Sequence, residues 1–292
     1  MIPCIFPSAF FDPTIFEKEQ EILFRNTWQL IGFQSDLEKH NDYICENIGG
    51  KSIVVQNFRG KLKAFHNVCA HRYSRIRQCE KGNGPLRCPY HGWTYNSEGI
   101  PIGIPNKAQF EKDGNFDKEN FKLEEWHIGT VGQFVFVKQN DDGIFLENFL
   151  GEAHQFLELI SNALGTKLDC NRFTIKANWK IVVENTLENY HVSLIHPETF
   201  DTIGTSGQDF RFDSPHSFWS SKLNEKTKKK WKRAEKFVAT RPFQSDSYNH
   251  QLIFPNMTIA TTFGLSFGIQ IFNPVSPTET LFTSYSFSTK LE

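Results

Sequence analysis

The chain has 292 residues, enough to bury one large core or two of medium size. Its 32 basic and 33 acidic side chains leave a net charge of −1, which argues against nucleic acid or an anionic membrane surface as a partner. No run of about 18 apolar residues occurs, so no membrane-spanning helix is expected. Four of the six cysteines, Cys4, Cys45, Cys79 and Cys170, are scattered without a pairing rhythm, and the N-terminus lacks a secretory signal, which together predict a cytoplasmic protein.

The first half of the sequence predicts one helix followed by a β-rich segment. A helix is expected over residues 10–30, where Asp12 can cap it, Pro13 suits its first turn and apolar residues recur at helical spacing. From about residue 40 to 140 the pattern changes to short strands between turns, with strands expected at 52–57, 61–66 and 131–137. This texture predicts an antiparallel β module that carries loops.

The second half predicts helices interspersed with strands. A helix is expected over 145–164, with apolar residues on one broad face and Gly165 as its C-terminal cap. Another helical segment is expected around 181–196, and strands are expected at 257–273 and 279–290. The changes in texture predict an N-terminal helical segment, a β domain and a C-terminal domain, with bounds at 1–39, 40–145 and 146–292.

Two Cys–His pairs, Cys69-Ala-His71 and Cys88-Pro-Tyr-His91, lie in the predicted β module. Two thiolates and two imidazoles are the ligand set of a Rieske [2Fe–2S] cluster, in which the cysteines hold one iron and the histidines the other. The alternative is a zinc site, but zinc modules commonly group Cys with Cys and His with His. The interleaved order therefore favours the cluster. Cys79, in the same segment, is expected to be a free thiol.

These residues, with the segment 11–32 before them, resemble the α subunits of the Rieske non-haem iron oxygenases. The resemblance implies an α+β fold. In that fold an antiparallel Rieske β domain is inserted between an N-terminal helix and a helix-grip (START-like) catalytic domain with a mostly antiparallel sheet. It also implies that residues 1–39 pack with the catalytic domain, that 40–145 form the Rieske domain and that 146–292 form the catalytic domain.

A second motif resembles the signature of the oxygenase catalytic domain. It comprises Asn178-Trp179-Lys180, Glu184-Asn185, Glu188, His191 and His196. The resemblance implies that His191 and His196 bind a mononuclear Fe(II). It implies that Glu188 takes the place of the bridging acid, which relays between this iron and the cluster of a neighbouring subunit. Two histidines and one carboxylate would leave open positions on the iron for O₂ and substrate.

The spacing within this motif predicts its local geometry. On a helix Glu188 would share a face with His191, three residues later, and Glu184 would lie on that face to orient an imidazole. His196 would point away, so the helix should end or bend near Ser193 to bring both imidazoles onto one ion.

The third iron ligand is missing from the predicted set. The family supplies an Asp from a long helix near the C-terminus, and no helical segment of this kind is predicted before residue 292. None of the downstream acids is nominated: Glu198, Asp201, Asp209, Asp213, Asp246 and Glu279. Two hypotheses follow: the sequence is cut short at its C-terminus, which we favour, or a natural short form has lost the carboxylate.

The resemblance implies an enzyme that uses O₂ and NAD(P)H-derived electrons to hydroxylate, dihydroxylate or oxidatively demethylate a small organic substrate. It implies a separate reductase or ferredoxin as electron donor, and a homotrimer or a trimer with a second subunit type. Neither a nucleic acid nor a membrane is expected as a partner. The alternatives are a degenerate or truncated family member, or a Rieske electron-transfer protein without oxygenase activity.

Three further features admit more than one interpretation. The basic run at 222–236 fits a solvated helix or a lid, or a docking patch for an acidic reductase or ferredoxin. The six tryptophans are expected to pack in the core, although some could form an aromatic cage for a quaternary ammonium substrate. The remaining histidines without metal-ligand spacing are expected to be structural or exposed: His66, His127, His154, His216 and His250.

Overall fold

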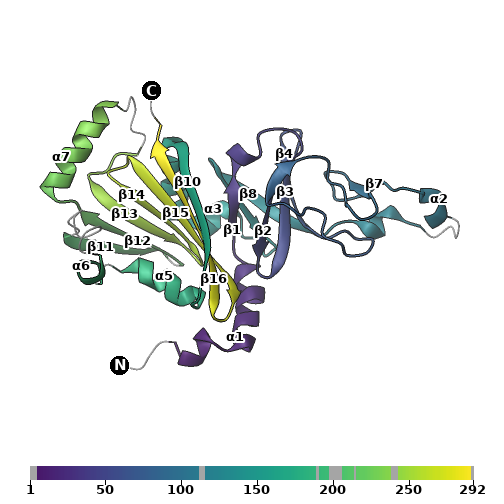
Figure 1. The fold of residues 1–292 in the computed structure, drawn as a ribbon, viewed down its shortest axis with the longest axis horizontal. Helices are drawn as coiled ribbons and strands as arrows, with labels where there is room; N and C mark the ends of the chain where they lie inside the picture. Colours follow the sequence, from purple (N-terminus) through teal and green to yellow (C-terminus); the bar gives the residue numbers. More distant parts are fainter. Residues whose placement is uncertain are drawn as a thin grey trace. The chain divides into compact units, whose positions relative to one another are not determined.

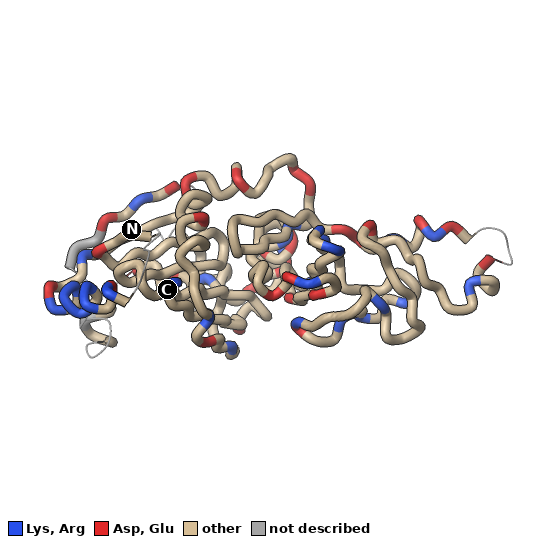
Figure 2. Tube along the Cα trace, turned by 90° about the horizontal axis from the view of Figure 1, so that it is seen from above, with Lys and Arg blue, Asp and Glu red and all other residues tan. Residues whose placement is uncertain are grey.

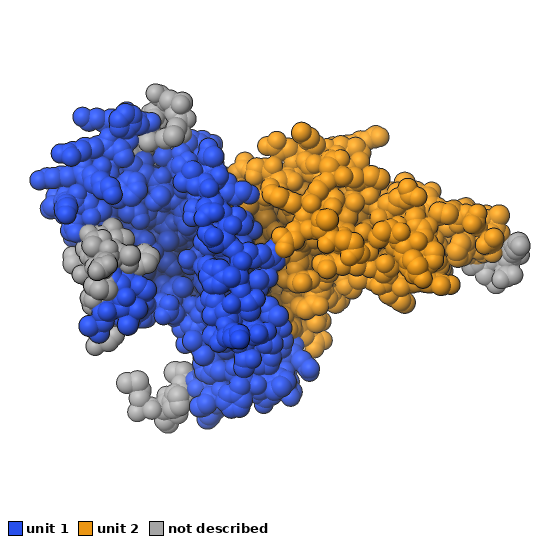
Figure 3. Space-filling view, in the orientation of Figure 1, with its two compact units in different colours: residues 1–19, 147–292 blue, residues 20–146 orange. Residues whose placement is uncertain are grey.

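The structure is a computed structural model that describes residues 5–111, 116–188, 191–196, 206–213, 215–237 and 243–290. Contacts divide the chain into two compact units, coloured separately in Figure 3. Unit 1 comprises Met1–Glu19 and Glu147–Glu292, and unit 2 comprises Gln20–Leu146. This division falls at residues 19/20 and 146/147, whereas the domain boundaries predicted from the sequence, near 39 and 145, remain a proposal. No described helix is long and apolar enough to cross a membrane.

Unit 2 is built on a seven-stranded antiparallel sheet (Figure 1). Its strand order is β1 (Gln29–Phe33), β9 (Phe134–Lys138), β8 (Glu125–Val131), β4 (Lys61–His66), β3 (Lys51–Phe58), β2 (Asp42–Ile48) and β5 (Lys81–Asn83). A two-stranded sheet of β6 (Thr94–Tyr95) and β7 (Pro101–Gly103) accompanies it. Short helical segments η3 (Gln34–Asp36), α2 (Lys107–Phe110) and η4 (Lys118–Phe121) lie in its connections.

Two apolar clusters fill unit 2. Ile53 and Val55 of β3 belong to one cluster, and Val54, which points to the opposite side of the strand, belongs to the other. The second cluster also contains Cys69, Cys88 and the aromatic residues that pack around them. The loops with the two Cys–His pairs are therefore anchored in a core and not on a free surface.

Unit 1 is built on a second seven-stranded antiparallel sheet (Figure 1). Its order is β10 (Leu164–Ile175), β16 (Glu279–Thr289), β15 (Ser266–Ser276), β14 (Met257–Thr262), β13 (Ser247–Ile253), β12 (His216–Lys222) and β11 (Ser206–Asp213). Strand β10 forms one margin of this sheet and pairs with β16 alone among the described strands.

Helices lie on both faces of the unit 1 sheet. Helix α4 (Glu152–Ala163) follows the short α3 (Leu146–Leu150), and its Phe156 contacts the Phe218 ring with centroids 5.8 Å apart. Helix α5 (Trp179–Leu187) packs against β15 and β16. Trp219, the neighbour of Phe218, points to the opposite face of β12, where it stands across from His250 of β13.

The N-terminal segment corrects the prediction of one helix over 10–30. Helix α1 (Pro13–Lys18) begins as expected, because Asp12 Oδ1 accepts the Thr14 N–H at 2.8 Å. It follows the turn η1 (Pro7–Phe10) and continues as the π-helical η2 (Glu19–Phe24), but residues 29–33 then form strand β1. All five residues of β1 are buried, and their apolar run suits a strand covered on both faces.

Glycines explain two more departures from the prediction. The helix expected over 145–164 is broken between α3 and α4 at Gly151, whose φ of +52° suits glycine best. Gly165, expected as a helix cap, instead lies in strand β10, where a Cβ would come within 2.5 Å of the Thr289 carbonyl oxygen. The apolar runs 131–137 and 257–273 are also each split by a turn between two strands, β8–β9 and β14–β15.

The basic run forms helix α7 (Glu225–Ala234), followed by η6 (Glu235–Phe237). Trp231 and Ala234 pack against a buried cluster of Leu223, Phe263 and Leu265, so the helix has an apolar side. Figure 2 shows basic residues gathered along α7. Six exposed cations lie on α7 and η6: Lys226, Lys229, Lys230, Lys232, Arg233 and Lys236. The run is therefore a helix, and its use as a docking patch remains a prediction.

Candidate functional site

The two Cys–His loops of unit 2 are built in the same way. The Cys69 N–H donates to the Ser74 carbonyl at 2.8 Å, and the Cys88 N–H donates to the Trp93 carbonyl at 2.8 Å. Each loop is also closed four residues after its cysteine, where Tyr73 N–H donates to Cys69 O at 2.9 Å and Gly92 N–H donates to Cys88 O at 3.0 Å. Tyr73 and Gly92 both have positive φ, at +55° and +73°. Each cysteine thus stands at the base of a tight, self-closed turn.

The four predicted cluster ligands come together between these loops. Both cysteines are buried, and the rings of His71 and His91 lie with centroids 4.8 Å apart. His71 also stacks on Trp93, at 4.8 Å and an interplanar angle of 10°. The Nδ1 atom of His71 is buried and has no hydrogen-bond partner. A buried imidazole nitrogen without a partner fits a ligand position, because such nitrogens are otherwise bonded to protein or water.

The surroundings of Cys69 also fit a cluster ligand. Burial raises the pKa of the Cys69 thiol, while hydrogen bonds from the Tyr95 hydroxyl and the His71 backbone lower it, and the neighbouring Cys88 thiol raises it again. The Tyr95 hydroxyl lies 3.0 Å from Cys69 Sγ and accepts the Ala70 N–H at 3.2 Å. Buried thiols that lie next to each other can both be deprotonated when metal ions bind them.

The arrangement also bears on the zinc alternative. A zinc ion would draw four side chains to one point at about 2.0–2.3 Å. Within the described parts of the chain, no three His, Cys, Asp or Glu side chains converge in this way. In a two-iron cluster each iron takes only two protein ligands, so four side chains around a larger space suit the cluster better.

In unit 1 the motif Asn178-Trp179-Lys180 fixes the start of helix α5. Asn178 caps the helix by accepting the Lys180 N–H at 3.1 Å, and its amide donates to the Pro277 carbonyl at 2.7 Å. The Glu19 carboxylate contacts the side chains of Trp179 and Lys180. Trp179 Nε1 donates to it at 2.9 Å, and Lys180 Nζ lies 2.6 Å from it. Sequence reasoning missed Glu19, because it lies about 160 residues earlier in the chain.

Helix α5 ends earlier than the spacing predicted. Its last residue is Leu187, and Glu188 is extended, with φ −128° and ψ 157°. Asn189 and Tyr190 lie outside the described residues, and the short helix α6 (Val192–Ile195) follows, with His191 before it and His196 after it. The prediction of a bend near Ser193 is therefore wrong in position, and Glu188 and His191 do not share a helix face.

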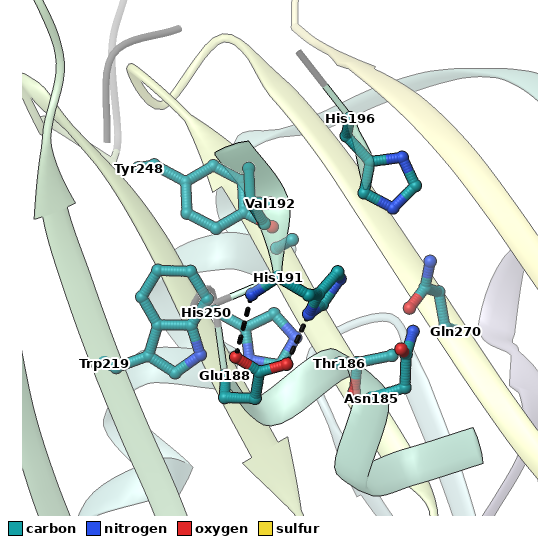
Figure 4. Close-up of a pocket in the computed structure, with 11 residues that line it drawn as sticks. Asn185, Thr186, Glu188, His191, Val192, His196, Trp219, Tyr248, His250 and Gln270 are labelled. Carbon is teal, nitrogen blue, oxygen red and sulfur yellow. Dashed lines mark hydrogen bonds and ion pairs between the residues drawn. The ribbon is translucent and has the colours of Figure 1, made fainter. Parts of the chain in front are cut away.

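Glu188 nevertheless contacts His191. The His191 backbone N–H donates to Glu188 Oε2 at 3.3 Å, and the ring Nδ1 is hydrogen-bonded to Glu188 Oε1 (Figure 4). The extended backbone at Glu188 turns the chain so that the carboxylate folds back onto the histidine three residues later. Glu184, predicted to orient an imidazole, is exposed and does not line the pocket beside these residues.

The two predicted iron ligands lie close together. The rings of His191 and His196 have centroids 5.5 Å apart and an interplanar angle of 72°. Imidazole nitrogens bind a metal at about 2.1 Å, so rings at this separation are able to share one ion. Glu198 and Asp201 lie outside the described residues, and the described acids Asp209, Asp213, Asp246 and Glu279 do not line this pocket. A third ligand is thus not found among the described residues.

His191 and His196 open onto a cavity of about 220 Å³ between the α5–α6 segment and the sheet. Trp219, Tyr248, His250 and Gln270 line it from the sheet, with Gln270 at the opposite end from Trp219, and Asn185 lines it from α5 (Figure 4). The sequence did not indicate that Trp219 and His250 line this cavity, and both were expected to be packing or structural residues. The alternation in strand 247–253 places Tyr248 and His250 on one face, and this was the available signal.

Burial sets the protonation of two wall residues. It lowers the pKa of His250 to about 4, so the ring is neutral near pH 7. It raises the pKa of Tyr248 to about 12, so the phenol keeps its proton. Two other histidines without metal-ligand spacing differ in burial. His216 is a buried structural residue whose Nε2 lies 2.7 Å from the Phe149 carbonyl, whereas His127 is exposed.

Two family models match the chain, one within each unit. Residues 27–126 match the Rieske [2Fe-2S] domain, and residues 157–290 match the family described as Ring hydroxylating alpha subunit (catalytic domain). The large subunit of anthranilate 1,2-dioxygenase from Acinetobacter baylyi is 32% identical over 202 residues, which cover 66% of this chain and 42% of that protein. The oxygenase subunit of carnitine monooxygenase from Acinetobacter pittii is 32% identical over 225 residues, which cover 74% of this chain and 58% of that protein.

Among solved structures, the quaternary ammonium Rieske monooxygenase in complex with L-carnitine has a similar fold. The TM-score is 0.81 at 22% identity, over 98% of this chain and 75% of the other. The chain belongs to the α subunits of the Rieske non-haem iron oxygenases, as the sequence motifs predicted. This family combines a [2Fe–2S] domain with a catalytic domain that holds mononuclear iron, and the predicted α+β fold is confirmed.

Within that family the chain is related to the carnitine and glycine betaine monooxygenases and to the ring-hydroxylating dioxygenases. It spans about half of the two relatives compared above, 42% and 58% of their lengths. Members of this family are multicomponent oxygenases that take electrons from a reductase.

Proposed function

We propose that this chain carries the oxygenase function of a multicomponent Rieske system. The reaction class is hydroxylation, dihydroxylation or oxidative demethylation of a small organic substrate with O₂ and NAD(P)H-derived electrons. One observation carries the proposal: two identically built Cys–His loops occur in the same chain as a His191–His196 pair that opens onto a cavity. An electron-transfer protein would need only the loops.

Cys69, Cys88, His71 and His91 are the proposed ligands of the [2Fe–2S] cluster. Two buried thiols, two imidazoles at 4.8 Å and the partnerless Nδ1 of His71 support this assignment. The cluster supplies single-electron transfer when bound. The Tyr95 hydroxyl, next to Cys69 Sγ, would hold one thiolate by a hydrogen bond, and Trp93 would hold the His71 ring in place by stacking.

His191 and His196 are the proposed protein ligands of the mononuclear iron, which supplies O₂ activation when bound. Glu188 would act through His191. Its carboxylate accepts a hydrogen bond from His191 Nδ1, which fixes the tautomer and leaves Nε2 free as a ligand. A carboxylate in this place also suits the bridging role that the family assigns to this position, between the iron and the cluster of a neighbouring subunit.

The proposed partners follow from the same arrangement. A separate reductase or ferredoxin would deliver electrons to the cluster, and a homotrimer, or a trimer with a second subunit type, would bring the two metal centres of neighbouring chains together. A cytoplasmic location is proposed on the cysteines, since none of the five described ones forms a disulfide.

Isotope-labelled oxygen tests the proposal directly. Purified protein that contains iron and sulfide should incorporate ¹⁸O from ¹⁸O₂ into a substrate when a reductase and NADH are supplied. The His191→Ala variant should lose product formation while the visible spectrum of the cluster stays intact. Colourless protein that binds zinc, or a His191→Ala variant that loses the cluster spectrum, would contradict it.

A degenerate or incomplete oxygenase is the second candidate. One observation favours it: among the residues that the structure describes, no acid that could serve as the third iron ligand beside His191 and His196 is found in the pocket. Iron quantitation separates the two candidates, because a working oxygenase holds about three irons per chain and a carrier or incomplete site about two.

A further inference from the structure

The cavity beside His191 contains polar groups that have no partner in the protein. Trp219 Nε1 and His250 Nδ1 are buried without a hydrogen bond, and both residues line the cavity. The two residues are 6% and 3% exposed. Leaving a buried polar group unbonded costs about 1–3 kcal/mol, so native proteins keep few of them. Two such groups on one cavity wall therefore call for a ligand.

Two more wall residues add hydrogen-bonding capacity. The Gln270 carbonyl oxygen accepts the Thr258 hydroxyl at 3.2 Å, which leaves the Gln270 NH₂ group as its free donor. The Tyr248 hydroxyl has no hydrogen-bond partner among the described residues. Ser221 and Thr261 also have buried hydroxyls without a partner, but neither residue lines this cavity, so they do not contribute to the proposed site.

The sheet places these four residues on one face. Trp219 stands opposite His250 across β12 and β13, and Tyr248 precedes His250 by two residues. Gln270 stands opposite Thr258, which is two residues from Ala260, the partner of His250. Residues directly opposite or two apart in a sheet share a face, so strand register alone assembles the wall.

The chemistry of the wall is rich in donors and carries no charge. The indole N–H and the amide NH₂ are donors only, and a neutral imidazole and a phenol each offer one donor. Among the described residues, no Lys or Arg lines the cavity. Such a wall can donate hydrogen bonds to oxygen acceptors, an interaction that a hydrocarbon cannot make.

We propose that Trp219, Tyr248, His250 and Gln270 bind the substrate by hydrogen bonds to an acceptor oxygen, so that the substrate class bears a carboxylate, carbonyl or hydroxyl group. The inference rests on the proposed function, since it assigns substrate contacts in the same pocket. The wall would hold the oxygen-bearing end of the substrate opposite His191 and His196, which leaves the other end toward the iron ligands.

Paired ligands that differ only in the acceptor test this inference. The first pair is benzyl alcohol and ethylbenzene, and the second is glycine betaine and isobutyltrimethylammonium. Binding to the full chain, loaded with iron and kept free of O₂, is measured by calorimetry. Because no turnover is needed, a failure of the oxygenase proposal, which ¹⁸O incorporation reveals, is distinguishable from a failure of this one.

The expected result is a preference for the acceptor-bearing member of at least one pair, by about tenfold or more. Tyr248→Phe and Gln270→Leu should each reduce that ratio several-fold. The control Tyr285→Phe removes a hydroxyl from β16 in the same sheet, outside the cavity, and should leave the ratio unchanged.

Three results would overturn the inference. One is equal or tighter binding of the acceptor-free member in both pairs, which would favour an apolar pocket or a cage for the cation alone. Another is a ratio that neither Tyr248→Phe nor Gln270→Leu changes. The third is binding by none of the four compounds at millimolar concentration.

Discussion

The two candidate metal centres are assembled in opposite ways. In unit 2 each Cys–His loop closes on itself within five residues, through backbone hydrogen bonds at 2.8–3.0 Å. In unit 1 the pocket gathers residues from the α5–α6 segment and from strands β12 to β15. A local site depends on its own turn, whereas a dispersed site depends on the register of a whole sheet. Substitutions should therefore have different consequences in the two places.

The largest expected effect is loss of the cluster in Cys88→Ser. A hydroxyl is a poor ligand for cluster iron, and Cys88 is buried with no alternative thiol on its own loop. The visible absorbance and the product formation should both disappear, while the unit 1 pocket keeps its fold.

The matched control for this substitution is Cys79→Ser, at an exposed free thiol in the same segment. It should leave absorbance and activity at wild-type values. Loss of the cluster in the Cys79 variant would contradict the assignment of the four ligands.

The next effect concerns the link from Glu188 to His191. Glu188→Gln keeps the shape but weakens the acceptor at His191 Nδ1, so activity or iron affinity should fall about 10- to 100-fold. Single-turnover kinetics and iron quantitation measure the two quantities separately. Glu184→Gln, at an exposed position on α5, is the control. Equal behaviour of the two variants would contradict a special role for Glu188.

A smaller effect is expected at the anchor of helix α5. Glu19→Gln removes the charged partner of Lys180 and weakens the bond from Trp179, where the Glu19 and Lys180 side chains are only 16% and 11% exposed. The free energy of unfolding should fall by about 1–3 kcal/mol in urea titrations. The control Glu17→Gln lies on the exposed side of α1 and should change it by less than about 0.5 kcal/mol. A cluster spectrum that stays unchanged would show that the effect is confined to unit 1.

The smallest effect is a pH dependence from His216. Burial lowers its pKa below the ordinary value of 6.5, and the neutral ring accepts the Phe254 N–H at 3.1 Å. The unfolded chain therefore binds this proton more readily. Its contribution to stability is full above about pH 6.5 and is lost as the pH falls below that value.

Urea unfolding at pH 7.5 and 5.5 measures this contribution. Between these values the wild type should lose more stability than His216→Gln, in which the proton site is absent, by at most about 1.4 kcal/mol for one proton. An identical pH dependence of the two proteins would show that His216 does not titrate as its burial implies.

Sequence reasoning is most informative where the residues concerned are close along the chain. Each Cys–His pair of the quartet Cys69, His71, Cys88 and His91 lies within four residues, and the four side chains lie near one another in the structure, while their role as cluster ligands stays a prediction. The cap at Asp12 and the helix at α4 followed from the same kind of short-range signal.

The remainder depended on contacts that are distant in sequence. The helix expected over 10–30 extended into the start of strand β1, because an apolar run fits helix or strand until its pairing with β9 is known. Register across four strands brings Trp219, His250 and Gln270 to one cavity, and no spacing along the chain encodes this. The break at Glu188 was also missed, since one helical segment was expected around 181–196.

The twelve-residue strand β10 at the margin of the unit 1 sheet has a practical consequence. Leu168 and Phe173 are 66% and 52% exposed there, and no described strand pairs with the outer side of β10. A long open margin with apolar side chains recruits strands from other molecules. Self-association of the purified chain should therefore be sensitive to a lysine at position 168 or 173, and solubility work on this protein has a defined place to begin.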